Sequence, residues 1–181
     1  MTAYIAMLRG INVSGQKIIA MAELHKMFVK LGHKDAKTFI QSGNVVFTSA
    51  GKDAGKLAKS IEAAIEKAFG FEVPVILRNL ESMRASLASN PYGKRKLAEN
   101  ERLYISWLET VPAKEATSKL EALADAKDEL KVKGSEVFLL IRDGYGRSVL
   151  NNNFIEKKLG LRATTRNLES SRKLVALAET L

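Results

Sequence analysis

The chain has 181 residues, with 29 Lys and Arg against 20 Asp and Glu, and a net charge of +9. Hydrophobic residues make up 46% of it, a share typical of a globular protein with a substantial core. The absence of cysteine excludes disulfides, thiolate zinc sites and a cysteine nucleophile. The two histidines stand outside any metal-binding motif, so we expect neither a metal site nor a cofactor.

The location and partners follow from hydropathy and charge. No apolar stretch approaches the roughly 18 residues that span a bilayer, and the first ten residues lack the pattern of a secretion signal. We therefore expect a cytoplasmic protein with no membrane partner. The positive charge favours an anionic partner such as nucleic acid or a nucleotide. A lysine-rich surface that only keeps the protein soluble is the alternative.

The first half of the chain has the order β-α-β-β-α-β, which is the ferredoxin-like pattern. Hydrophobic periodicity and glycine-rich turns define its elements. We expect, in chain order, a strand at 4–8, a helix at 21–31, strands at 38–41 and 45–48, a helix at 57–68, a strand at 73–77 and a helix from residue 80. The strand at 4–8 is apolar at every position, so we expect both of its faces to be buried.

Residues 91–101 combine glycine and charge, and they predict a solvated linker between a half at 1–90 and a half at 102–181. The pattern then restarts. We expect a strand at 103–108, a helix with Leu120, Leu123 and Ala124 on its apolar face, strands at 130–132 and 137–141, a helix at 154–159, a strand at 162–166 and a final helix.

Two short sequences recur in corresponding places of the two halves. Tyr4-Ile5-x-x-Leu8 recurs as Tyr104-Ile105-x-x-Leu108, and the seven positions 78–84 recur as 166–172 with Arg-Asn-Leu-Glu-Ser-x-Arg in both. The second match lies where the fourth strand of each half leads into a helix. We conclude that the chain is an α+β protein, an α/β sandwich of two tandem ferredoxin-like βαββαβ halves packed together by an internal duplication.

The opening segment, Tyr4 to Val13 followed by Gly15 and Met21 to Leu24, resembles the bacterial domain-of-unknown-function family 1697. So do Thr38 to Phe47 and the late segment from Ala163 to Leu174. The closing motif of that family usually carries tryptophan where Leu168 stands. The resemblance covers nearly the whole chain and implies an α/β fold with ferredoxin-like features, but no reaction, cofactor or partner.

The loop Gly10–Gly15 leads from a buried strand into a helix and is the first candidate site. Such loops often hold anions, and Arg9, Asn12, Ser14 and Lys17 surround this one. The phosphate-binding loop of ATPases is excluded, because lysine does not directly follow the second glycine. The alternative is a turn in which Asn12 bonds the backbone.

The segment Gln41, Ser42, Gly43 and Asn44 is the second candidate. Its glycine and asparagine suit a hairpin for backbone reasons alone, whereas the polar Gln41 beside an apolar strand is less explained. We expect this turn and the Gly10–Gly15 loop to lie at opposite ends of the sheet, so that they need not form one site.

The repeated arginines are the third candidate. Asn79 and Asn167 can cap the helices that follow them, but Arg78 and Arg166 have no such role and can hold an anion. Arg166, Asn167, Arg172 and Lys173 belong to the most basic stretch, 145–173, which has seven basic and two acidic residues.

The sequence offers no catalytic set, so its catalytic residues are unknown. We expect an anion-binding module for nucleic acid or a nucleotide. The alternative is an enzyme that acts on a small phosphorylated or carboxylated substrate where the two halves meet. A purely structural role or a protein partner is the third possibility.

Overall fold

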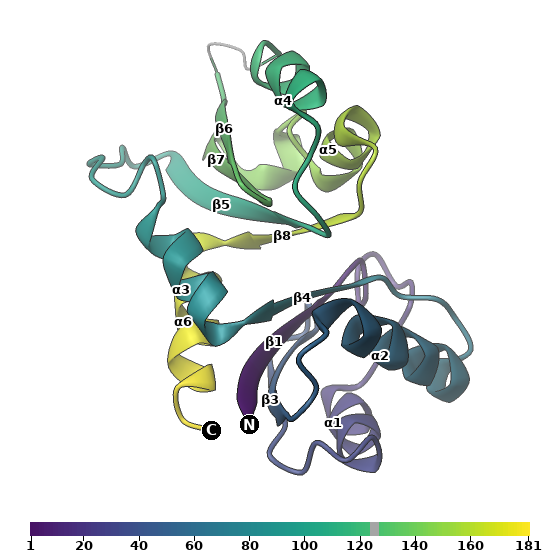
Figure 1. The fold of residues 1–181 in the computed structure, drawn as a ribbon. Coiled ribbons are helices and arrows are strands. Elements are labelled where there is room, and N and C mark those ends of the chain that lie inside the picture. The colour runs from purple at the N-terminus through teal and green to yellow at the C-terminus, as the bar shows by residue number, and fades with distance from the viewer. Residues whose placement is uncertain (124–126) are drawn as a thin grey trace. The chain divides into compact units, whose positions relative to one another are not determined.

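The chain folds into two compact units, which Figure 1 shows as ribbons. The computed structural model describes residues 1–123 and 127–181, so Ala124 lies outside the described residues. The first unit consists of residues 1–85 and 172–181, and the second of residues 86–171. The last ten residues of the chain therefore belong to the first unit. The expected division of the chain into halves at 1–90 and 102–181 stays a prediction.

The first unit has a four-stranded antiparallel sheet in the order β2-β3-β1-β4. Its strands are β1 (Thr2–Leu8), β2 (Lys37–Phe39), β3 (Asn44–Ser49) and β4 (Val75–Asn79), and its first two helices are α1 (Met21–Lys30) and α2 (Ala54–Phe69). The helices α3 (Leu80–Ala88) and α6 (Leu168–Ala178) each cross the division between the units.

The core of the first unit lies between the sheet and the helices α1 and α2. Tyr4 and Phe47, on neighbouring strands, are buried and stacked with their ring centroids 5.9 Å apart. Asp53 caps the start of α2 by accepting the N–H of Lys56, and Gly70 ends it with a φ of 80°. Every residue from Tyr4 to Leu8 is buried, as the continuous apolar run predicts.

The second unit repeats this topology with a sheet in the order β6-β7-β5-β8. Its elements are β5 (Glu101–Leu108), α4 (Lys114–Glu121), β6 (Glu129–Lys133), β7 (Glu136–Arg142), the 3-10 helix η1 (Tyr145–Arg147), α5 (Asn152–Leu159) and β8 (Ala163–Asn167). Its core joins the sheet to α4 and α5. The α+β fold with two similar halves is thus confirmed.

The repeated sequences pair in the same register in both units. Tyr4 lies opposite Asn79 in the first sheet, and Tyr104 lies opposite Asn167 in the second. Each asparagine caps the next helix, because its Oδ1 accepts the N–H of Ser82 at 2.7 Å in one case and of Ser170 at 2.6 Å in the other.

Two elements are shorter than the hydrophobic pattern predicts. The strand β2 ends at Phe39, because Ile40 adopts a φ of 51°, which no strand residue can have. The helix α4 ends at Glu121, so Leu123 lies in a turn and is 45% exposed.

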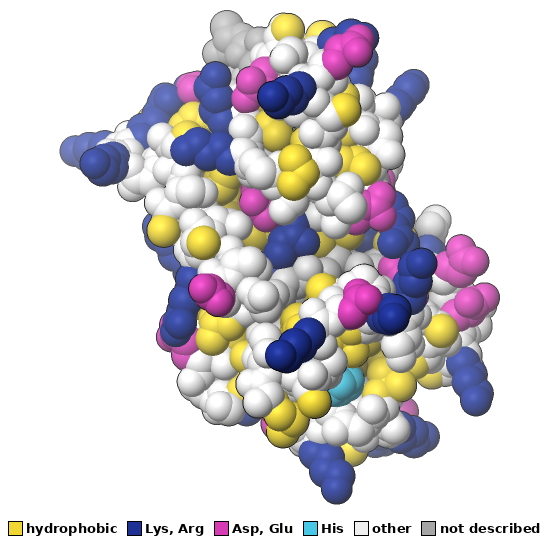
Figure 2. All heavy atoms as spheres, in the orientation of Figure 1, with side chains coloured by type: hydrophobic (Ala, Val, Ile, Leu, Met, Phe, Trp, Pro, Cys, Tyr) yellow, Lys and Arg dark blue, Asp and Glu magenta, His cyan; other side chains and the backbone are white. Residues whose placement is uncertain are grey.

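The segment between α3 and β5 is exposed at residues 91 and 93–100, and a side chain from it is bonded to the second sheet. The Arg95 guanidinium donates to Glu101 and to Glu129, both at 2.9 Å, and Arg142 bonds the same two carboxylates. We call these four residues the ion-pair cluster. Nearby Tyr92 is buried, and this burial raises its pKa to about 12. Figure 2 shows Lys and Arg side chains gathered on the projecting part of this segment.

Candidate functional site

Three connections of the first unit meet at one end of its sheet. β1 runs antiparallel to both β3 and β4, so the end of β1 lies beside the start of each: Met7 is opposite Asn44, and Leu8 is opposite Val75. The connections 9–20, 40–43 and 70–74 therefore lie together, and we call them the loop end of the first sheet. The expectation that the first two lie at opposite ends is wrong, because it overlooked this antiparallel pairing.

Asn12 ties the first two connections together. Its Nδ2 donates to the carbonyl oxygens of Ile19, at 2.9 Å, and Gln41, at 2.8 Å, while its Oδ1 accepts the N–H of Ile19 at 2.8 Å. Both polar atoms of the Asn12 side chain thus bond backbone groups, which confirms the alternative prediction that Asn12 shapes a turn. These bonds close residues 12–19 into a ring and fix that ring against the β2–β3 turn.

The loop end has an unusual concentration of left-handed backbone. Positive φ angles occur at Gly10, Asn12, Ser14, Gly15, Lys17, Ile40 and Gly43. A residue other than glycine costs about 1–3 kcal/mol in such a conformation, and it persists only where the surroundings enforce it. Isoleucine is β-branched and among the least suited of all residues to this region. The glycine at position 43 is needed for space as well, since a Cβ there would lie 2.5 Å from Ile11 Cδ1.

The third connection is bound to the first through a lysine side chain and a backbone bond. Lys17 Nζ donates to the carbonyl oxygen of Glu72 at 2.6 Å, and the N–H of Arg9 donates to that of Pro74 at 2.9 Å. Lys17 and Ser14 are exposed, and Arg9 is half-buried. Within the described residues, no intramolecular hydrogen bond uses the backbone N–H of Ser14 or Gly15. Two backbone N–H groups of this exposed ring are therefore not used within the described part of the protein, two and three residues before Lys17.

Three large apolar side chains stand exposed on the same loops. Val13 is 58%, Ile18 62% and Ile40 46% exposed. Sequence reasoning missed all three, because it searched for polar and charged residues. For Val13 and Ile18, the available signal was a β-branched residue in a segment with no helix or strand periodicity to bury it, whereas Ile40 lies in the predicted strand 38–41 and gave no such signal.

The β2–β3 turn holds its predicted residues in different roles. Asn44 is fully buried, and its Nδ2 donates to Phe39 O at 3.0 Å and to Ser42 Oγ at 3.1 Å, so it shapes the turn. Gln41 contributes its carbonyl oxygen to Asn12 and is exposed.

The repeated arginines lie away from the loop end. Arg78 pairs with Ile5, in the half of β4 remote from Val75, and its Nη1 donates to Leu77 O at 3.0 Å. Arg166 belongs to the second unit, where it is buried and donates to Thr164 Oγ1 at 2.8 Å and to Thr165 O at 2.9 Å. Burial lowers the pKa of Arg166 to about 10. Both arginines bond their own strands.

The rest of the basic stretch is similarly divided. Arg172 and Lys173 are exposed on α6, in the part that belongs to the first unit. Arg162 Nε donates to Glu109 Oε2 at 2.8 Å in the second unit. The predicted anion-binding residues therefore lie in several places, and the structure brings Arg9, Asn12, Ser14, Lys17 and Gln41 together at the loop end.

Within residues 1–123 and 127–181, no group of three His, Asp or Glu side chains could hold a metal ion. No helix in that same part of the chain has the length and hydropathy to cross a membrane.

Comparison with known proteins fixes the family. A family model described as a protein of unknown function, DUF1697, matches residues 1–138. The chain belongs to the DUF1697 family. The range that matches the DUF1697 model includes the whole loop end.

A solved structure shares the fold of this DUF1697 chain. The conserved bacterial protein SP0830 from Streptococcus pneumoniae is 24% identical, with 98% of each chain covered and a TM-score of 0.76. At that identity the likeness shows the fold alone. None of the curated proteins compared with the chain matches it.

Proposed function

We propose that the chain is an anion-binding module that takes nucleic acid or a nucleotide at the loop end of the first sheet. The observation that carries the proposal is the left-handed backbone of 10–17, which Asn12 locks in place. Strained backbone of this kind clusters at ligand clamps and switch regions. Ser14, Gly15 and Lys17 are exposed, and N–H groups in such a backbone together with a lysine suit a phosphate.

The exposed apolar side chains support the same class of ligand. A phosphate alone would need only the donors and the lysine. Val13, Ile18 and Ile40 add an apolar surface next to them, and such a surface suits the flat face of a nucleobase. The net charge of +9 would further attract a polyanion.

The direct test measures the binding of a labelled single-stranded oligonucleotide and of ATP by the wild type and by Lys17→Ala. Loss of one charge-assisted contact of about 1 kcal/mol should weaken affinity about fivefold. Lys59→Ala is the control for the loss of one exposed positive charge, because Lys59 lies on α2 outside the loop end. Equal affinities of Lys17→Ala and Lys59→Ala would contradict the proposal.

The salt dependence of the affinity distinguishes an oligonucleotide from ATP as the ligand. Oligonucleotide affinity should fall steeply between about 50 and 200 mM salt, because each neutralised phosphate releases counterions. ATP makes fewer phosphate contacts, so its affinity should fall less. The alternative of an enzyme stays a prediction.

We also infer that the protein works in the cytoplasm and that its two halves arose by duplication. The identical pairing of Tyr4 with Asn79 and of Tyr104 with Asn167 supports the duplication. The absence of cysteine is compatible with a cytoplasmic location.

A further inference from the structure

The corresponding end of the second sheet carries a pocket of about 310 Å³. β5 ends at Leu108, and Trp107 pairs with Glu136 at the start of β7. The β5–α4 connection and the β6–β7 turn therefore meet at this end, as the equivalent connections do in the first unit. The pocket lies between them and the first turn of α4, entirely within the second unit.

The length of one connection explains why the second unit has a pocket there. In the first unit, residues 9–20 join β1 to α1, and two side chains of this connection, Ile11 and Ile19, are 1% exposed and belong to the core. In the second unit, only residues 109–113 join β5 to α4. Val111 and Pro112 stand at the corresponding positions, three residues after the strand and directly before the helix N-cap. Pro112 is buried, but Val111 is 68% exposed and leaves the space beside the hairpin open.

The walls of the pocket are of two kinds. Val111, Pro112 and Val132 form an apolar side. Val111 is 68% exposed, although it lies only three residues after the end of the buried strand β5. Lys114, Thr117 and Ser118 form a polar side. They stand at positions i, i+3 and i+4 of α4 and so share one face of the helix.

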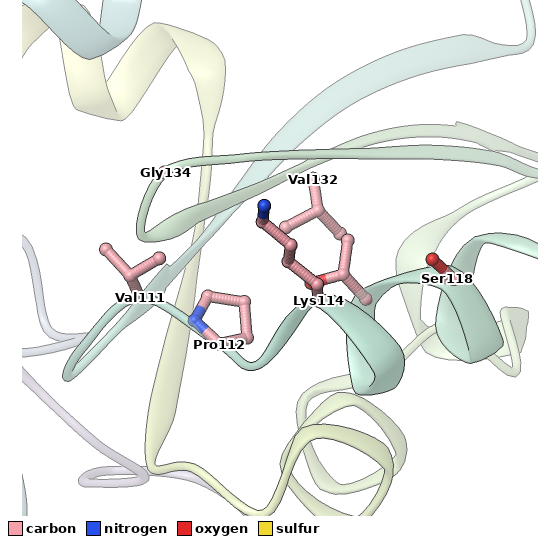
Figure 3. A pocket seen from close by; sticks show the side chains of 7 residues that line it. Val111, Pro112, Lys114, Ser118, Val132 and Gly134 are labelled. Carbon is pink, nitrogen blue, oxygen red and sulfur yellow. The ribbon is translucent and has the colours of Figure 1, made fainter.

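The polar side carries hydrogen-bond donors, which are the Lys114 ammonium and the hydroxyls of Thr117 and Ser118. Figure 3 shows the Lys114 side chain extending from the start of α4 toward the β6–β7 hairpin, with Val111 and Pro112 beside it. Among the described residues, no carboxylate lies within ion-pair distance of Lys114, and no hydrogen bond uses the hydroxyl of Thr117 or Ser118. By contrast, Lys119 on the same helix is paired with Glu115 at 2.6 Å.

We propose that this pocket binds a small organic anion, a carboxylate with a short aliphatic chain. The carboxylate would accept from Lys114, while the aliphatic chain lies against Val111, Pro112 and Val132. A volume of about 310 Å³ is at the lower end of the range for ligand pockets and holds roughly ten water molecules. That size accommodates a six-carbon acid. The site is separate from the loop end of the first sheet and does not depend on its function.

The test is an NMR titration of the full-length ¹⁵N-labelled chain with sodium hexanoate, with hexan-1-ol as the neutral ligand of equal length. Hexanoate should shift the amides of residues 111–118 and 132–134 saturably, with a Kd on the order of 1 mM. Hexan-1-ol should shift them much less, because it has no charge for Lys114.

Two variants sharpen the result. Lys114→Ala should raise the Kd for hexanoate about fivefold, whereas Lys119→Ala, which removes an equal charge outside the pocket, should leave it unchanged. Both lysines are exposed, so both variants should keep the wild-type spectrum elsewhere. The proposal is overturned by shifts that do not saturate, by equal shifts with hexan-1-ol, or by an unchanged Kd in Lys114→Ala.

Discussion

At the scale of single residues, Ile40 is the most informative position. It has a φ of 51° and is 46% exposed, so the chain holds a strained β-branched side chain out toward solvent. Stability alone would favour asparagine or glycine there, since both tolerate left-handed backbone. An isoleucine that costs stability without filling the core fits a residue kept for contact with a ligand.

This reading predicts that Ile40→Asn raises the free energy of unfolding by about 1 kcal/mol, because the strain is relieved. The same substitution should weaken binding at the loop end. Urea denaturation and the oligonucleotide assay measure the two effects. Ile18→Asn is the control: Ile18 is 62% exposed and has no positive φ, so its replacement should bring no gain in stability. An Ile40→Asn protein less stable than the wild type would show that the side chain is structural.

At the scale of elements, the ion-pair cluster attaches the segment before β5 to the second sheet. The pKa of Glu101 lies below its ordinary 4.5, mainly because the N–H of Ala98 donates to its carboxylate. The pKa of Glu129 is lowered mainly by its hydrogen bond from Arg142. Both carboxylates therefore bind protons more weakly in the folded than in the unfolded state. Their contribution to stability is complete above pH 4.5 and is lost as the pH falls through the lowered pKa values.

Removing one carboxylate should flatten that pH dependence. Glu101→Gln should be less stable than the wild type at neutral pH, and its urea midpoint should change less between about pH 5 and pH 3. Glu115→Gln, which alters only an exposed pair with Lys119, should keep the wild-type profile. Parallel profiles of the wild type and Glu101→Gln would mean that the cluster does not couple to folding.

Some of the strands and helices can be predicted from the sequence, and others cannot. Apolar runs predict the strands β1 and β5, and the glycine at position 70 predicts the end of the helix α2. These predictions succeed because burial and capping leave local patterns in the sequence. The left-handed Ile40 that ends β2 was beyond reach, since no local rule places isoleucine there. The loop end could have been assembled from topology alone, because β1 and β3 are antiparallel neighbours in a ferredoxin-like sheet. The ion-pair cluster joins residues 95, 101, 129 and 142, and pairing over such separations leaves no sequence pattern.

At the scale of the whole molecule, two units of one topology differ at the same end of their sheets. In the first unit a long connection fills that end and presents strained backbone with a lysine. In the second unit a short connection leaves a pocket. The shared framework and the different loops are what duplication followed by divergence would produce, because loops tolerate change better than the strands they join.

The most direct test of the account is to map ligand binding by NMR on the full-length chain, with ATP and a short single-stranded oligonucleotide as probes. Binding at the loop end should give the largest amide shifts at residues 10–18 and 40–43, with Lys17→Ala reducing them and Lys59→Ala leaving them unchanged. Shifts confined to other surfaces, such as the basic side chains of the segment after α3, would contradict it, as would the absence of any shift at low salt.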